Sequence, residues 1–450
     1  MTVVETGSPA EESYFWHPML HPAEMRRRKP IRIVRGDGCH VIDEAGHRLV
    51  DGVAGLWNVN VGHNRREVKA AIVAQLEELE YFQLFDGISH PRAEELSRVL
   101  HEMMAPEGIV RFVYNSGGSD AIETALKLAR QYWKLVGQAD RVKFISLKQG
   151  YHGTHFGGAS VNGNTVFRRN YEPLLPGCFH VETPWTYRNP FTEDPEALGR
   201  ICAELLEREI VFQGPDTVAA FVAEPIQGAG GVIVPPANYW PLVREVCDRH
   251  GVLLIADEVV TGFGRSGSMF GCRGWGVKPD IACLAKGISS GYVPLGATGV
   301  NERVAAAFYD NQNFTGAMMH GYTYAGHPVA CAAALASLAI VRDEDLPGNA
   351  ARQGAYLMER VKPLERFAAV GEVRGKGLMI ALDLVKDKKT REPIDPTAGY
   401  ADRVAAAARA AGALVRPVGT KIILSPPLVI QRAEIDVLAD ALHRAFEHAA

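Results

Sequence analysis

The sequence contains no CxxC pair, although it has seven cysteines among its 450 residues (39, 178, 202, 247, 272, 283 and 331). Closely spaced cysteines are the usual mark of a zinc site, or of a disulfide framework in a small secreted protein. The odd number and the scattered positions fit a reducing compartment better than a set of disulfides. We therefore expect neither a bound metal nor a disulfide scaffold.

Long runs of positive charge and long apolar runs are also missing. The one basic cluster, MRRRKP at 25–30, indicates a solvated loop, and the formal net charge is −4, so no nucleic-acid partner is expected. The N-terminus has no apolar signal-peptide core, and the longest apolar run, at 329–341, is too short to span a bilayer. These absences predict a cytoplasmic protein with no membrane partner.

The composition is that of a globular protein, with 47% hydrophobic and 22% charged residues. A chain of 450 residues exceeds the usual size of one domain. We expect an N-terminal segment (1–64) that contributes to a small domain, a large domain (65–328), and the C-terminal remainder of the small domain (329–450).

The region from about 65 to 310 alternates short β-branched runs with Ala/Leu/Glu-rich helical patterns. Several of these runs are apolar throughout, as strands buried on both faces of a parallel sheet are. The pattern predicts an α/β fold with a mainly parallel sheet. The candidate strands are 110–115, 142–147, 218–225 and 252–258.

The two ends of the chain have a different pattern. Residues 31–55 alternate apolar and polar side chains around glycine turns, which predicts a small antiparallel meander. Near the C-terminus, an Ala-rich helix at 401–412 is followed by two short strands, LVRP (414–417) and KIILSPP (421–427). A smaller α+β domain that combines both chain ends is therefore expected.

A Gly/Ser turn opens an amphipathic helix in NSGGSDAIETALKLAR, at 115–130. Free N–H groups at a helix start, the helix dipole and the Ser119 hydroxyl would stabilise a phosphate without a cationic side chain. The same pattern also describes an ordinary N-cap and turn. A phosphate site therefore needs support from other motifs.

An apolar strand in VLLIADEVVTGFGRSG (252–267) brings Asp257 and Glu258 to its carboxyl end, where open α/β sheets bind ligands. A buried carboxylate there needs a partner, and a pyridinium nitrogen is one. An ionised Asp257 would keep such a ring protonated, so that it accepts electrons from a substrate carbanion.

Lys286 follows another apolar strand-like run, in DIACLAKGISSGYVPLGA at 280–297. Most lysines are solvated surface residues. An ammonium at the end of a buried strand would instead be desolvated, and so easier to deprotonate. A neutral amine in that position can form an imine with a carbonyl compound.

A competing interpretation comes from Gly262, Gly264 and Gly267, which spell GxGxxG after the strand that carries Asp257. A dinucleotide-binding turn follows its strand directly and opens a helix. Here four residues separate Asp257 from the first glycine, and the following SMFGCRGWG is a poor helix. A nicotinamide oxidoreductase thus stays an alternative, but the strand, turn and helix that such a site requires are not indicated around these glycines.

In this order, the three segments resemble the class III aminotransferases, pyridoxal 5'-phosphate (PLP) enzymes of fold type I, the aspartate aminotransferase fold. The resemblance covers nearly the whole chain and implies a large domain with a mainly parallel, seven-stranded sheet beside a smaller α+β domain. Further matching segments are AGLWNVNVGH (54–63), GYHG (150–153), AEPIQGAGGVIVPP (223–236), GYTYAGHPVA (321–330) and LVRPVGTKIILSPPL (414–428).

The resemblance implies a role for each residue of the cofactor site. Lys286 would form the Schiff base with PLP and move a proton between substrate and cofactor, and Asp257 would pair with the pyridine nitrogen. Tyr151 would stack on the ring, Val259 would pack on its other face, and Glu224 would support the ring hydroxyl side. The other implied cofactor residues are Gly117, Gly118 and Ser119 at the phosphate, His152 beside Tyr151, and Tyr322 and Thr323, which would reach the phosphate of the neighbouring subunit in a homodimer or a tetramer.

The resemblance also separates substrate classes. Ornithine and γ-aminobutyrate transaminases continue the EPIQG segment with a Glu that masks an arginine, whereas this sequence has Ala229, and the arginine itself is absent from IILS (422–425). Arg416 instead resembles the mobile arginine of ω-amino acid and amine:pyruvate transaminases. It would pair with the carboxylate of pyruvate or alanine and swing away for an uncharged or cationic donor. A surface arginine after a strand is the alternative.

Trp57, Phe85 and Tyr151 resemble the aromatic walls of the substrate pocket in that subgroup, with Leu56 beside Trp57. Such walls accept β-alanine, longer ω-amino acids, diamines such as putrescine, or arylalkylamines, and the sequence ranks none of these first. Trp57 is also compatible with a packed core residue.

The leading hypothesis is an aminotransferase that moves an amino group from an ω-amino acid, diamine or amine donor to pyruvate. The same cofactor residues would serve a 2-oxoglutarate-dependent aminotransferase, an aminomutase or a decarboxylating transaminase, because PLP chemistry is selected by which substrate bond stands perpendicular to the ring. A non-catalytic PLP-sensing regulator would need a basic DNA-binding domain, and none fits ahead of the meander at 31.

Overall fold

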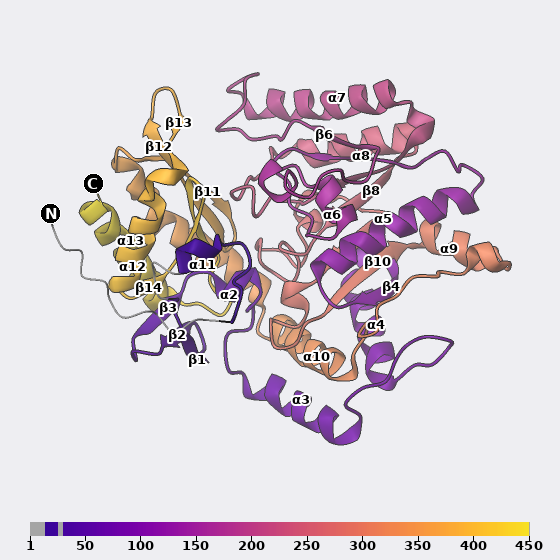
Figure 1. Ribbon diagram of the computed structural model, residues 1–450, viewed down its shortest axis with the longest axis horizontal. Helices are drawn as coiled ribbons and strands as arrows, with labels where there is room; N and C mark the ends of the chain where they lie inside the picture. Colours follow the sequence, from indigo (N-terminus) through magenta and orange to yellow (C-terminus); the bar gives the residue numbers. More distant parts are fainter. Residues whose placement is uncertain (1–13, 26–29, 450) are drawn as a thin grey trace.

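The computed structural model describes residues 14–25 and 30–449, which form a larger and a smaller α/β unit side by side (Figure 1). Most of the basic cluster at 25–30 lies outside the described residues. In the larger unit, only β10 runs antiparallel to its neighbours, so the predicted mainly parallel sheet is confirmed. Across this sheet the strands are β4 (Ile109–Asn115), β10 (Gly296–Asn301), β9 (Ile281–Leu284), β8 (Leu253–Asp257), β7 (Val218–Ala223), β5 (Lys143–Leu147) and β6 (Cys178–Val181).

The central strands are buried on both faces. In β8, Leu254 and Ile255 belong to two different apolar clusters, because successive side chains of a strand point to opposite faces. One face is covered by α5 (Gly118–Leu135) and α9 (Glu302–Asp310). The other is covered by α4 (Pro91–Met103), α7 (Pro195–Gln213), α8 (Tyr239–His250) and α10 (Pro328–Asp343). This double cover explains why the strand sequences are apolar throughout.

Two other helices extend this arrangement: α3 (Arg66–Glu78), which packs on α10, and α6 (Phe156–Val161), which packs on α5. A short helix, α1 (Pro22–Met25), precedes β1 in the chain. None of the helices within the described residues combines the length and the apolar character that a bilayer crossing requires.

The smaller unit joins the two ends of the chain. The predicted meander is observed as β1 (Ile33–Asp37), β2 (His40–Asp43) and β3 (Arg48–Asp51), and β3 pairs in parallel with β14 (Ala413–Leu414) from the C-terminal region. A second sheet contains β11 (Val370–Lys376), β12 (Met379–Asp387), β13 (Glu392–Pro393), β15 (Arg416–Val418) and β16 (Lys421–Leu424). The accompanying helices are α11 (Leu346–Val361), α12 (Tyr400–Ala410) and α13 (Arg432–Ala449). The domain boundaries after residues 64 and 328 stay a prediction.

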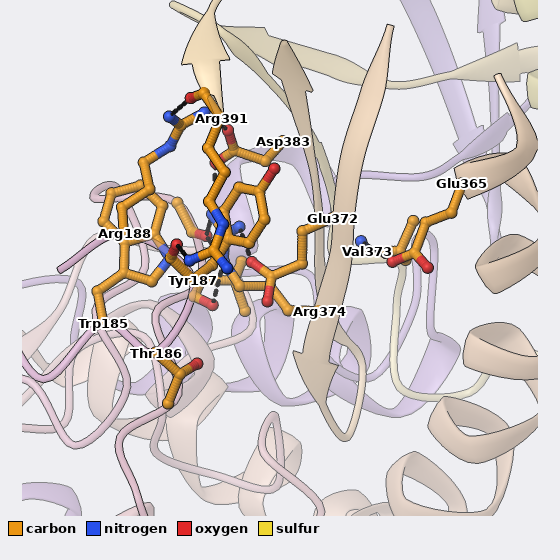
Figure 2. Close-up of polar contacts among 12 residues, drawn as sticks. Trp185, Thr186, Tyr187, Arg188, Glu365, Glu372, Val373, Arg374, Asp383 and Arg391 are labelled. Atoms are coloured by element: carbon orange, nitrogen blue, oxygen red, sulfur yellow. Dashed lines mark hydrogen bonds and ion pairs between the residues drawn. The ribbon is translucent and has the colours of Figure 1, made fainter. Parts of the chain in front are cut away.

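A buried ionic network fastens the two units (Figure 2). The loop between β6 and α7 carries Arg188, whose guanidinium forms an ion pair with the fully buried Asp383 of β12. The second oxygen of Asp383 accepts a hydrogen bond from Arg374 of β11 over 3.1 Å, and Arg374 also pairs with Glu372 over 2.7 Å. The Arg374 guanidinium lies 4.8 Å from the ring centre of Trp185, from the same loop. One carboxylate is therefore shared by two cations from different units.

Replacing Asp383 with alanine should lower the free energy of unfolding by about 3–5 kcal/mol, because two guanidinium groups with little solvent access lose their shared counter-charge. Urea denaturation followed by tryptophan fluorescence measures the change. The control is Glu102→Ala, which removes an exposed ion pair with Arg98 and should cost about 1 kcal/mol or less. Equal losses in the two variants would contradict the prediction.

Candidate active site

A cavity of about 350 Å³ opens at the carboxyl ends of β4, β5, β7, β8 and β9. This edge is where parallel α/β sheets place their ligands. Segments distant in the sequence therefore meet here because their strands end side by side. The predicted site residues that line the cavity are Leu56, Gly117, Gly118, Ser119, Tyr151, His152, Glu224, Asp257, Val259 and Lys286.

The start of α5 forms one end of the cavity. The helix begins at Gly118, and the first N–H groups of a helix have no acceptor within it. An added Cβ at Gly118 would lie 2.8 Å from Val259 Cγ1, and one at Gly153 would lie 2.6 Å from Ser119 Oγ. Both approaches are closer than a side chain tolerates. The turn can thus hold a phosphate against backbone N–H groups and the Ser119 hydroxyl.

Asp257 ends β8 inside the cavity and is 4% exposed. Its Oδ2 lies 2.8 Å from Nδ1 of the buried His152, and its Oδ1 accepts a hydrogen bond from Val259 N over 3.1 Å. Asn162 in turn accepts from His152 N and donates to Gly153 O, which fixes the backbone on both sides of the histidine. This arrangement holds the carboxylate in one orientation, ready for a cationic ring nitrogen.

Lys286 follows β9 and has a left-handed backbone conformation with φ of 47°. None of the described residues forms a hydrogen bond or ion pair with its ammonium. Burial lowers the pKa of Lys286 below its ordinary value, Asp257 and Glu224 act in the opposite direction, and Arg416 adds to the lowering. A larger fraction of this amine is therefore neutral at a given pH than of a solvated lysine, which suits a nucleophile or a proton acceptor.

Glu224 lies beyond the end of β7 and joins two loops of the site. Its Oε1 accepts a hydrogen bond from Tyr151 N over 3.0 Å, and its Oε2 accepts one from Gly228 N over 2.8 Å. Burial raises the pKa of Glu224, with a further rise from the charge of Asp257. The Tyr151 ring packs edge-on against Phe167 at 4.9 Å, and burial raises the pKa of its hydroxyl.

The predicted substrate residues are distributed differently. Leu56 lines the cavity, whereas Trp57 is 4% exposed and belongs to an apolar cluster with Ile226, Val232, Met379, Ala381 and Ile423. Ala229 is half-buried and is not among the lining residues. The side chain of Arg416, on β15, has no hydrogen bond or ion pair with any described residue. Burial lowers the pKa of Arg416, and the charge of Tyr151 opposes this, so the guanidinium lies close to the site.

Phe85, Tyr322 and Thr323 lie together but do not line this cavity. An added Cβ at Gly321 would lie 2.5 Å from Phe85 Cε1, which places the phenyl ring against the segment that carries Tyr322 and Thr323. Tyr81 donates a hydrogen bond to Thr323 O over 2.6 Å. Phe85 itself is 43% exposed. Large apolar side chains exposed in the neighbouring sequence are Phe82, Ile88, Met319 and Tyr324.

Several lining residues were not predicted from the sequence. Gly153 and Asn58 belong to segments that match the family, but nothing in the sequence assigned a role to these two residues. The residues from 289 to 295, which follow Lys286, add small and apolar side chains to the lining of the cavity. The unpredicted lining residues are Asn58, Ser116, Ile122, Gly153, Val260, Ala285, Ser289, Gly291, Val293, Pro294 and Leu295.

The chain matches the family model described as Aminotransferase class-III over residues 23–446. A solved amine transaminase from an uncultivated Pseudomonas species, in its PLP-bound form, is 60% identical, with a TM-score of 0.96 and coverage of 98% of this chain and 100% of that one. The putrescine–pyruvate aminotransferase of Pseudomonas aeruginosa is 39% identical over 93% of this chain and 91% of its own. The diaminobutyrate–2-oxoglutarate transaminase of Halomonas elongata is 39% identical over 92% of this chain and 90% of its own.

Replacing Gly118 with alanine should weaken PLP binding about tenfold or more, because the added methyl group would collide with Val259 at the turn that we expect to hold the phosphate. An absorbance titration of the cofactor-free protein with PLP measures the dissociation constant. Gly274→Ala is the control, since its added Cβ meets no atom closer than 3.6 Å. Unchanged affinity in the Gly118 variant would exclude this phosphate position.

Proposed function

Since the chain belongs to the class-III aminotransferase family, we propose that it transfers the amino group of an amine, diamine or ω-amino acid to pyruvate. It is a PLP-dependent aminotransferase, as the family and the PLP-bound relative indicate. The choice of donor and acceptor is our proposal, and it is based on the charges around the cavity.

PLP supplies an electron sink that stabilises negative charge at the substrate carbon. The described residues fit this cofactor. Gly118 leaves room for a phosphate at the start of α5, Asp257 offers a buried carboxylate for a ring nitrogen, and Lys286 offers an amine with a lowered pKa in the same cavity. On this basis, Ser119 would hold the phosphate and Val259 would pack on one face of the ring, opposite Tyr151.

Lys286 would have two tasks. Its Nζ would hold the cofactor between reactions. Once released, Nζ would accept the proton that leaves the substrate carbon and pass it to the cofactor. Both tasks need the neutral amine, and desolvation favours that form.

Asp257 would keep the ring nitrogen protonated, and His152 would prevent its carboxylate from rotating away. The hydrogen bond from Val259 N holds the other oxygen. Because the carboxylate is buried, its charge acts on the ring with little screening by water.

The observation that carries the choice of acceptor is the unpaired guanidinium of Arg416. It lies close enough for its charge to act on Lys286 and Tyr151, and no described carboxylate pairs with it. A guanidinium in such a position binds the carboxylate of a keto acid through two parallel hydrogen bonds. Lys286 is the only lysine or arginine among the described residues that line the cavity, so a second carboxylate, as in 2-oxoglutarate, would lack a partner.

The walls of the cavity support an amine donor with an apolar chain. Leu56, Val260 and Val293 face the space, with Pro294 and Leu295 beside them. A short aliphatic or aryl group fits such walls, whereas a donor with a carboxylate would also need Arg416. The donor named for the putrescine–pyruvate relative likewise has no carboxylate.

We further propose that two copies of the chain form a homodimer in which Phe85, Tyr322 and Thr323 complete the partner's cavity. These residues do not line the cavity of their own chain, and they lie within a surface that exposes several large apolar side chains. Surfaces of this kind are usually covered by another protein.

Replacing Lys286 with alanine should reduce the transfer of amino groups about a thousandfold or more, while PLP still binds through the residues around its phosphate and ring nitrogen. Alanine formed from pyruvate gives the rate, and absorbance after gel filtration gives the bound cofactor. Lys148→Ala, which removes a surface ion pair with Glu182, is the matched control and should keep its activity. Turnover in the Lys286 variant would refute the assignment.

Replacing Arg416 with alanine should raise the KM for pyruvate about tenfold or more, because a charge-assisted hydrogen bond to the carboxylate is lost. The KM for an amine without a carboxylate should change little. Separate measurement of the two half-reactions by stopped-flow absorbance makes the comparison, with Arg352→Ala as a solvent-exposed control. An equal rise for both substrates, or faster turnover with 2-oxoglutarate than with pyruvate in the unmodified protein, would contradict the proposed acceptor.

A further inference from the structure

The segment Ala54–Trp57 (α2), on the substrate side of the cavity, has a strained backbone. Ala54, Gly55 and Trp57 all have positive φ, at 46°, 63° and 66°. Residues other than glycine, asparagine and aspartate rarely adopt this conformation, and for a bulky residue such as tryptophan it is exceptional. A backbone of this kind persists only where surrounding groups over-determine it.

The group that holds the segment is the carboxylate of Asp51. It is fully buried at the end of β3, and its two oxygens accept hydrogen bonds from Val53 N over 3.1 Å and from Gly55 N over 2.8 Å. Nε2 of His63 lies 2.8 Å from the same oxygen that binds Gly55. One carboxylate thus ties together both sides of the strained turn and a residue that follows it.

His63 is itself fixed from the other side. Its backbone exchanges two hydrogen bonds with Gly38, of 2.8 and 3.0 Å, and its ring lies so close to Gly36 that an added Cβ would be 2.7 Å from Cγ. The ring therefore has one place to lie, with Nε2 directed at Asp51. This contact connects the turn to the meander at the edge of the small unit.

The two sides of the strained turn have different contacts. Leu56 and Asn58 line the catalytic cavity, and Leu56 N donates to Asn58 Oδ1 over 3.2 Å. On the opposite side, Trp57 packs against Ile226 and Val232, from the loop that follows Glu224. A shift of the turn would therefore change the substrate end of the cavity and the loop of Glu224, and would leave the phosphate end on α5 in place.

We propose that Asp51, oriented by His63, is a positioning residue that sets which donors the enzyme accepts. It touches neither substrate nor cofactor and acts by holding Leu56 and Asn58 in the cavity wall. This inference rests on the proposed function, since it concerns the donor half-reaction of that site.

The chain provides a matched control. In β2, Asp43 accepts hydrogen bonds from Ala45 N and His47 N over 3.0 and 2.9 Å, and its second oxygen lies 2.9 Å from His47 Nδ1. It is the same kind of Asp–His pair closing a turn in the same sheet, but it lies at the surface and away from the cavity. The Asp43 variant thus shows the effect of losing any Asp–His contact in this sheet, whereas the Asp51 variant shows the effect of displacing the cavity wall.

The experiment compares four variants of the PLP-loaded enzyme: Asp51→Asn, His63→Leu, His63→Gln and Asp43→Asn. An amide at 51 offers one acceptor oxygen in place of two, so at least one of the N–H groups at Val53 and Gly55 loses its partner. Leucine at 63 removes the ring donor, whereas the side-chain amide of glutamine can place a nitrogen near the position of Nε2. The readout is kcat/KM for a bulky arylalkylamine relative to that for a small aliphatic amine, with pyruvate as acceptor.

Asp51→Asn and His63→Leu should shift this ratio about tenfold, since small displacements of a binding wall have effects of this size. His63→Gln and Asp43→Asn should leave it unchanged, and the cofactor absorbance and the KM for pyruvate should stay the same in all four. If Asp51→Asn does not fold, His63→Leu decides alone. An unchanged ratio in a folded His63→Leu variant, or an equal shift in Asp43→Asn, would overturn the inference. Failure of the unmodified protein to use any amine would instead refute the proposed function.

Discussion

The desolvation of Lys286 beside the buried carboxylate of Asp257 is the constraint on which the large unit depends. The two residues follow neighbouring parallel strands, so the topology of the sheet alone brings an amine and an acid to one edge. Neither charge is stable there without compensation, because burial of an unpaired ion is costly. Asp257 is compensated by its contacts with His152 and Val259 N, and burial lowers the pKa of Lys286, which favours the neutral amine.

The site has two halves that are held in different ways. The cofactor half is built entirely on the large sheet, whose strands are covered by helices on both faces and leave their carboxyl ends little freedom. The wall proposed for the donor combines Leu56 of the small unit with Val260, Val293, Pro294 and Leu295 of the large unit, and the proposed acceptor residue Arg416 lies on β15 of the small unit. The part that comes from the small unit is positioned by contacts between the units, among them the shared, fully buried carboxylate of Asp383. Such an arrangement would allow the proposed donor preference to vary while the cofactor chemistry stays constant.

Sequence patterns predicted the large sheet well because its strands are apolar on both faces. Some strands were not predicted, and β6 (Cys178–Val181) is one of them. β10 contains two glycines in Gly296–Asn301 and has little β-propensity, and its place between β4 and β9 is decided by pairing. The long pair β11 and β12, the main strands of the small unit, gave no clear alternation that separated them from the helices nearby.

For the site, the motifs singled out Lys286, Asp257 and the turn at 117–119, which the structure brings to one cavity, because each has a local signature of strand, turn or helix. The contacts that orient these groups have no such signature. Asn162 contacts His152, and Asp51 contacts His63. These are ordinary polar residues in the sequence, and only the folded structure shows that they orient one another. For Trp57, the family resemblance suggested a pocket wall, with a packed core residue as the alternative. In the structure its contacts are those of a buried cluster.

The parallel pairing of β3 with β14 has a consequence for biosynthesis. Gly52, at the base of the substrate wall, donates to Leu414 O and accepts from Ser425 N, so its partners leave the ribosome more than 350 residues after it does. The large sheet, by contrast, is complete in sequence by residue 301. During synthesis, a nascent chain can therefore assemble the cofactor half early, whereas the segment 54–58, which we propose to influence the choice of donor, is closed in only when translation is almost finished.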